Sequence, residues 1–180
     1  MKKTILTISM VYLSMLLVHA QGSMPLLELK LAGNWQIDSV SFGKPVDINK
    51  DGVKSANAVK EYSACLRVQQ LTFAGDYTAN GATGTGVDGC KEKVTKYSKW
   101  ALERKVDEDE QRKYDNAKDK KSLKKPEKRT FLTLAYEDDP DEKEEFEVVS
   151  LTKDVLQVMG YVSFDDSSAP AMIFWKKVKK

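Results

Sequence analysis

The stretch from Thr130 to Tyr136, TFLTLAY, decides the fold class of this chain. Leu132, Leu134 and Tyr136 fall on one face of the segment, with a threonine and an alanine between them. Successive side chains of a β-strand point to opposite faces, so this alternation is typical of a strand that turns one face to a core. The sequence therefore predicts a strand here, and the neighbouring segments indicate the fold to which this strand belongs.

Short segments of the same kind precede and follow this strand. Turn-forming residues such as Lys153-Asp154 separate them. The other predicted strands are Gly33 to Val40, Leu66 to Phe73, Tyr77 to Asn80, Tyr97 to Leu102, Phe146 to Leu151, Val155 to Val162 and Ala171 to Trp175. No strand–helix–strand rhythm interrupts the series, which argues against a parallel nucleotide-binding sheet. About eight strands and one short helix predict an all-β fold, either a closed antiparallel barrel or a sandwich.

The first of these strands shows its expected faces clearly. Trp35, Ile37 and Ser39 fall on one side of the strand, and Gln36, Asp38 and Val40 on the other. A glycine opens the strand.

The N-terminus resembles an export signal. Lys2 and Lys3 precede a mainly apolar run of 14 residues from Ile5 to Val18, and Val18-His19-Ala20 offers small residues before a cut. A membrane span needs about 20 apolar residues, so an uncleaved anchor is the weaker alternative. We predict a signal peptide at 1–20, a leader at 21–30 and a barrel domain at 31–180, exported to the periplasm or secreted, without a stable membrane span.

The amino-acid composition limits the kinds of catalysis and metal binding that are expected of this chain. The chain has 180 residues with 29 Lys+Arg and 27 Asp+Glu, and removal of Lys2 and Lys3 with the signal leaves 27 of each. His19, the single histidine, would be removed as well. Catalysis that needs an imidazole and zinc sites that need histidine are therefore not expected, and we predict that the protein is not an enzyme.

Two cysteines, Cys65 and Cys90, remain in the exported chain. In an oxidising compartment a single pair predicts a disulfide. The bond would close a loop of 24 intervening residues, which the chain-entropy model values at about 3 kcal/mol. Two free buried thiols are the alternative.

Two charged segments stand out between the strands. Lys105 to Arg129 holds 17 charged residues in 25, and its middle, Glu108 to Lys121, predicts a helix with pairs such as Glu108–Arg112. Glu137 to Glu147 holds eight acids around Pro140, which suggests a hairpin tip. The basic half of the first segment lacks interleaved aromatic residues, so nucleic-acid binding is not expected.

The segment from Asp47 to Val53, DINKDGV, has the form of a cation-binding loop. The side chains of Asp47, Asn49 and Asp51 can converge on one ion, and the Val53 carbonyl would be the next ligand. Oxygen donors alone favour calcium. Ser55 would then serve a water-mediated contact or cap a short helix from Ala56 to about Tyr62.

The twelfth position of this loop departs from an EF-hand. Ala58 stands where a bidentate glutamate belongs, and Glu61 follows one helical turn later, from where it could reach back. A turn rich in Asp and Asn without an ion is the alternative interpretation.

Taken in order, these features resemble a family. Gly33-Asn34-Trp35 is similar to the Gly-x-Trp signature of lipocalins, and the DxNxDG segment, Cys65, Leu71-Thr72-Phe73, Cys90 and Phe174-Trp175-Lys176 resemble bacterial lipocalin-like domain proteins. The resemblance covers about residues 30 to 176 and implies a lipocalin-like up-and-down barrel of eight strands. The insert at 105–129 departs from the short hairpin expected there.

The function expected from this fold is binding. Trp35, Trp100 and Trp175 are predicted to line a site for a small apolar ligand, or else to fill the interior of a small barrel. The leading hypothesis is an exported binding protein with a calcium-stabilised loop. A structural or protein-interaction barrel with a filled interior, whose protein partner the sequence does not identify, is the alternative.

Overall fold

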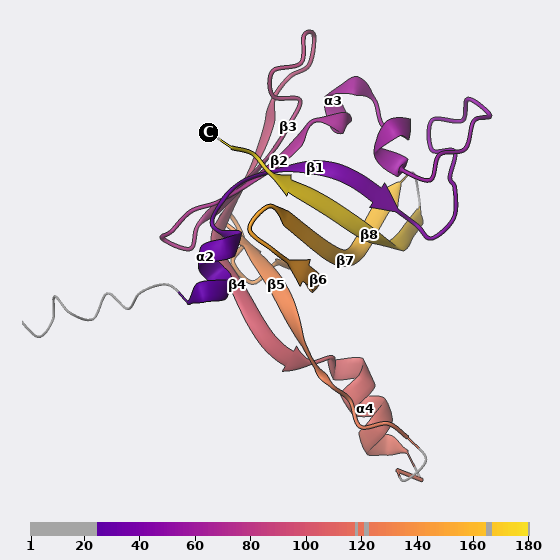
Figure 1. The fold of residues 1–180 in the computed structure, drawn as a ribbon, viewed down its shortest axis with the longest axis vertical. Helices are drawn as coiled ribbons and strands as arrows, with labels where there is room; N and C mark the ends of the chain where they lie inside the picture. Colours follow the sequence, from indigo (N-terminus) through magenta and orange to yellow (C-terminus); the bar gives the residue numbers. More distant parts are fainter. Residues whose placement is uncertain (1–24, 118, 121–122, 165–166, 180) are drawn as a thin grey trace, which may run out of the picture.

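A computed structural model describes residues 25–117, 119–120, 123–164 and 167–179. Within them, eight antiparallel strands close into a barrel in chain order, with β1 hydrogen-bonded to β8 (Figure 1). The strands are β1 (Gly33–Ser41), β2 (Gln69–Phe73), β3 (Ala79–Thr83), β4 (Lys93–Val106), β5 (Lys128–Tyr136), β6 (Lys143–Leu151), β7 (Val155–Phe164) and β8 (Ser167–Lys177). The predicted up-and-down barrel is confirmed, and the sandwich is excluded.

Four short helices accompany the strands in the described residues: α2 (Leu26–Leu31), η1 (Ala58–Glu61), α3 (Ala64–Arg67) and α4 (Glu108–Asn116). The helix predicted after the DxNxDG segment is the 3-10 turn η1. Its cap is Asn57, whose side chain accepts from the Val59 N–H. Ser55 was the predicted cap, but its backbone pairs with Val46 and its hydroxyl bonds to the backbone of Asn57.

A bulge corrects the predicted faces of β1. The pairing of β1 with β8 shifts between Ile37 and Ser39. The irregularity reverses the alternation of side chains beyond it. Val40, predicted on the side opposite Trp35, is consequently only 1% exposed, and Ser39, predicted on the side of Trp35, is half-buried.

One end of the barrel is closed by α2 and by the β2–β3 turn. Leu31 is fully buried, and its carbonyl accepts a 2.6 Å hydrogen bond from Trp35 Nε1. Trp100 Nε1 donates to the Ala74 carbonyl in the β2–β3 turn at 3.1 Å. Leu31, the first residue of the predicted barrel domain, is the buried residue of α2 and belongs to the core. Residues 1–24, with the predicted signal peptide, lie outside the described residues.

The opposite end, called the mouth here, carries the β1–β2, β3–β4 and β5–β6 connections. Cys65 in α3 and Cys90 in the β3–β4 connection are joined by a disulfide, with their Cα atoms 5.5 Å apart. The predicted bond is confirmed, and it ties the β1–β2 and β3–β4 connections together.

The charged insert forms an arm that leaves the barrel at the closed end, defined as residues 107–127 (Figure 1). Its helix α4 begins after Asp107, whose side chain accepts from the Glu110 N–H, and ends at Asn116. The predicted helix ran to Lys121, and Arg112 lies 3.9 Å from Asp109 rather than beside Glu108.

Candidate functional site

A cavity of about 350 Å³ lies inside the barrel and reaches the mouth. Its apolar wall comes from strands around the barrel and is formed by Leu71, Leu132, Leu134, Phe146, Leu156, Val158, Ile173 and Trp175. Polar side chains lie among the lining residues as well, and they include Gln69, Thr83, Lys93 and Glu144. The cavity is at the lower end of the usual range for small-molecule sites, about 300–1,000 Å³.

Small side chains on β3 help to leave this space open. Ala79, Gly81 and Thr83 alternate along the strand and share its inner face. A Cβ built on Gly81 would lie 3.6 Å from Leu71 Cδ2 and 3.7 Å from Tyr97 Cε2, an ordinary contact distance. The sequence ANGAT carries this signal, because small residues at alternate positions of a barrel strand cannot fill the interior. Sequence reasoning missed it.

One carboxylate stands in the wall of the cavity. Glu144 accepts hydrogen bonds from the hydroxyls of Tyr97, at 3.4 Å, and Tyr136. Sequence reasoning placed Glu144 in an exposed acidic hairpin. It shares a strand face with Phe146 and Val148, however, and that alternation could have located it.

The two tyrosines stay protonated beside this carboxylate. The hydrogen bond to Glu144 raises the pKa of Tyr136 to about 12, with burial as the second cause. Burial, followed by the charge of Glu144, raises the pKa of Tyr97 above its usual value. At neutral pH both hydroxyls are therefore donors to Glu144.

The three tryptophans that the sequence grouped together are separated. Trp175 lines the cavity. Trp35 and Trp100 are instead fully buried at the closed end, where Trp100 packs against Phe73 and Tyr77. Their indole N–H groups donate to backbone carbonyls of α2 and of the β2–β3 turn. These hydrogen bonds hold both rings at the closed end of the barrel rather than on the cavity wall.

The predicted cation loop brings three carboxylates together. Ligand atoms of Asp47, Asp51 and Glu61 all lie within 4.8 Å of one another. Asn49 Nδ2 lies 3.0 Å from Asp51 Oδ2, and Asn49 Oδ1 accepts from the Asp51 N–H. Val53 joins the loop through its N–H, which donates to Asp51 Oδ1 at 2.8 Å. The group could hold a cation, and it includes Glu61.

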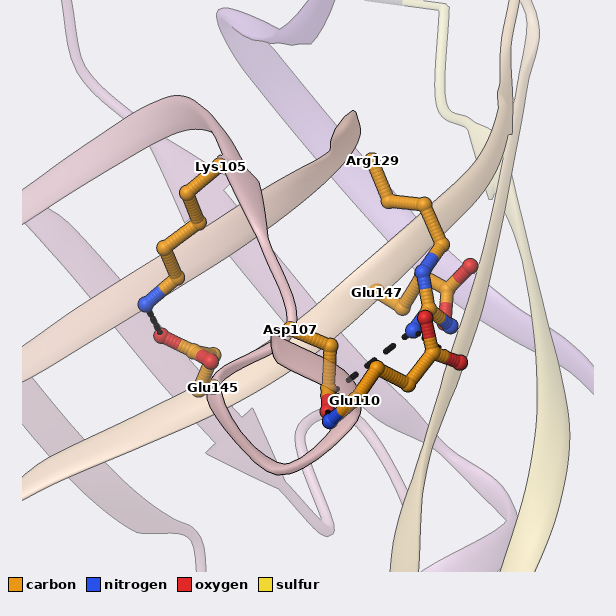
Figure 2. A network of polar contacts seen from close by, with 6 residues as sticks. All are labelled: Lys105, Asp107, Glu110, Arg129, Glu145 and Glu147. Atoms are coloured by element: carbon orange, nitrogen blue, oxygen red, sulfur yellow. Dashed lines mark hydrogen bonds and ion pairs between the residues drawn. The ribbon is translucent and has the colours of Figure 1, made fainter. Parts of the chain in front are cut away.

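A charged network fixes the base of the arm. Arg129 on β5 lies 2.6 Å from Glu147 on β6, 2.8 Å from Glu110 in α4 and 3.9 Å from Asp107 (Figure 2). Beside it, Lys105 Nζ lies 2.5 Å from Glu145 Oε2. Individual surface ion pairs contribute little, but a shared arginine orients several acids at once. Through Arg129, the helix α4 of the arm is therefore attached to β5 and β6 of the barrel.

Comparisons with known proteins add no relative. No family model matches the chain, and a search of the curated proteins finds no match. Among the described residues, no helix has the length and apolar character needed to cross a bilayer. The resemblance to lipocalin-like proteins stays a prediction.

Proposed function

We propose that this barrel is an exported binding protein that holds a small, mainly apolar molecule in its cavity. The observation that carries the proposal is the cavity itself, whose wall is mainly apolar where β5, β6, β7 and β8 line it and carries polar side chains on the side of β2, β3 and β4. Sites of this kind bind by burying the ligand's apolar surface, and the few polar groups set its orientation. The bonded cysteines support export, because such bonds persist in oxidising compartments.

The polar groups narrow the class of ligand. Glu144 is an acceptor beside the apolar side chains of the wall, and its tyrosine partners already donate to it. An apolar ligand with a hydrogen-bond donor, such as an amine or a hydroxyl, could use the remaining acceptor positions of Glu144. A ligand with a carboxylate at that point would meet a like charge. We therefore expect neutral or basic apolar compounds to bind better than fatty acids.

The test uses Trp175 as a reporter of binding. Titration with the neutral dye phenylnaphthylamine, which has an amine donor, should change tryptophan fluorescence and dye emission together. Gly81→Val should weaken binding about tenfold or more, because its methyl groups enter the cavity. Asn80→Val is the matched control, since Asn80 is exposed on the outer face of the same strand and should leave the affinity unchanged.

Native mass spectrometry of protein purified from its own host would identify the natural ligand. A bound apolar compound that is lost in Gly81→Val supports the proposal. A wild-type protein that neither carries a compound nor binds the dye contradicts it. That the protein is not an enzyme is part of this proposal.

A second candidate function is protein interaction through the arm. The specific observation is that α4 stands away from the barrel (Figure 1). Leu123, further along the chain, is 47% exposed and lies among charged side chains. Replacing 107–127 by an Asn-Gly turn should preserve the β4–β5 pairing, in which Val106 faces Lys128. Loss of a protein partner with intact dye binding would assign the interaction to the arm.

A further inference from the structure

We propose that Asp47, Asn49, Asp51 and Glu61 form a calcium site in which Glu61 supplies the buried ligand. The proposal is independent of the cavity ligand, because the four residues lie in the β1–β2 connection and none of them lines the cavity. The site would occupy the outer part of this connection, at the mouth of the barrel.

Glu61 carries the argument. Its side chain belongs to η1 and is only 7% exposed, which is unusual for a carboxylate. Among the described residues its Oε2 atom has no hydrogen-bond partner, although the atom is fully buried. A buried carboxylate oxygen without a partner is costly, and a bound cation is one of the few groups that removes this cost.

The neighbours of Glu61 increase the need for a positive charge. Asp47 and Asp51 place carboxylate oxygens within 4.8 Å of each other and of the glutamate. Three carboxylates at this distance repel one another unless they are protonated or share a cation. Calcium-binding loops in proteins combine several acids around one ion in the same way.

Backbone hydrogen bonds set the positions of the two aspartates. Asp47 accepts from the N–H groups of Asp51, at 3.2 Å, and Gly52, at 3.0 Å. Lys50 and Gly52 have positive φ angles of 60° and 87°, which turn the chain tightly between the two acids. A carboxylate oxygen that accepts one N–H keeps a second lone pair, so both side chains can still bind an ion.

The chemistry of the donors selects calcium. All four side chains offer oxygen, and three of them are carboxylates, which suits a hard cation. Calcium accepts six to eight oxygens in an irregular shell, whereas magnesium requires a nearly regular octahedron. A shell that joins an exposed loop to a separate 3-10 turn, with Ala58 at the usual closing position, fits the more tolerant ion.

Such an ion would attach an exposed loop to the barrel wall. Asn57, the cap of η1, accepts from the Val40 N–H at 3.2 Å and donates to the Asp38 carbonyl at 3.3 Å. The chain then continues into α3, where Arg67 donates to the carbonyls of Lys60 and Tyr62. Through Glu61, the loop at 47–53 would be joined to these anchored residues.

The experiment is a calcium titration of EDTA-treated full-length protein, followed by calorimetry and by thermal unfolding. We expect a dissociation constant of about 10⁻⁴–10⁻³ M, as for extracellular calcium modules, and a melting temperature that rises by a few degrees at millimolar calcium. Glu61→Gln and Asp51→Asn should each weaken binding about tenfold or more, because affinity follows the number of charged ligands.

Asp88→Asn is the matched control, since Asp88 is an exposed acid in another mouth connection and should bind calcium as the wild type does. Asp51 is exposed, so its variant should fold even where Glu61→Gln does not, and circular dichroism in EDTA checks both. A wild-type protein without heat or thermal shift overturns the proposal, as does undiminished binding in the folded variants. Equal responses to magnesium and calcium overturn the assignment to calcium. Dye binding to the cavity, measured separately, keeps the two proposals distinguishable.

Discussion

At the scale of single residues, Gly33 has a conformation that other residues avoid. Its φ angle is +127°, and a Cβ at this position would lie 2.7 Å from Lys177 Cε. Lys177 Nζ donates to the Lys30 carbonyl at 2.7 Å and lies 5.0 Å from the centre of the Trp35 ring. Because Gly33 has no Cβ, the Lys177 side chain can pack closely against the first strand. The contact is partly desolvated, and this burial lowers the pKa of the Lys177 ammonium group.

Gly33→Ala should therefore destabilise the barrel by about 2 kcal/mol, mainly through strain at the positive φ angle. Lys177 is flexible and can move, but it would then lose its bond to α2. Urea unfolding measures the change. Gly81→Ala is the matched control, since its Cβ meets only ordinary contacts and its φ is not positive. A Gly33→Ala variant as stable as Gly81→Ala would contradict this account.

For single residues, the sequence identified which side chains could bind an ion or lie in the interior better than it identified where each side chain lies in the fold. Asp47, Asn49 and Asp51 were recognisable from their spacing alone, because one loop contains all three. Whether Glu61 reaches them depends on how η1 packs on β1, and its burial is a property of tertiary structure. Trp35 and Trp100 were correctly taken as interior residues. Their separation from Trp175 depends on their depth along the barrel axis, which side-chain alternation does not encode.

At the scale of elements, the disulfide joins α3 to the β3–β4 connection. β2 and β3, which lie between the two cysteines, have five residues each and are the shortest strands of the described barrel. β1 pairs with β2 only from Gly33 to Gln36. Short ladders contribute few hydrogen bonds, so this part of the barrel depends more on its covalent link than the others do.

The double variant Cys65→Ser with Cys90→Ser should lose about 3 kcal/mol of unfolding free energy, because the unfolded chain gains the freedom of the opened loop. Denaturant unfolding under non-reducing conditions measures the difference. In the wild type, addition of reductant after denaturation should reproduce most of the loss. Equal stability of the double variant and the wild type would show that the crosslink constrains little.

The elements themselves were predictable to different degrees. The strands of the C-terminal third were found because each alternates over many residues, as in Thr130 to Tyr136. The predicted strand from Leu66 to Phe73 was wrong in its first half, since Leu66 and Arg67 belong to α3. Local propensity does not distinguish these states in so short a segment. The bulge after Ile37 was equally invisible, because it arises from pairing with β8.

At the scale of the whole molecule, the barrel combines a packed end and a hollow end. Trp35, Trp100 and Phe73 fill the first, each at most 2% exposed. The second is left open by small residues on β3 and lined by Trp175. Composition alone does not separate a filled barrel from a hollow one, because the same aromatic residues serve either. Whether the barrel is filled or hollow depends on how the large side chains are distributed along the barrel axis. That distribution is set only when the barrel closes.

This division predicts an uneven response to ligand. β2 and β3 are the shortest strands of the described barrel and form one wall of the cavity, so their amides should exchange with deuterium before those of β4, β5, β7 and β8. Phenylnaphthylamine in the cavity should slow exchange in β2 and β3, because ligand that binds only the closed barrel lowers the population of open forms. The arm at 107–127 does not line the cavity and should exchange at the same rate with and without the dye.

Hydrogen exchange followed by mass spectrometry gives both rates in one experiment. Gly81→Val distinguishes binding of the dye in the cavity from its other effects. With valine in the cavity, addition of the dye should leave the exchange rates of β2 and β3 unchanged. If the arm instead slows as much as β2 and β3 do, the dye binds outside the barrel. If neither region responds although dye fluorescence rises, binding does not involve the wall that Gln69, Leu71 and Gly81 provide, and the hollow end has a different role from the one proposed here.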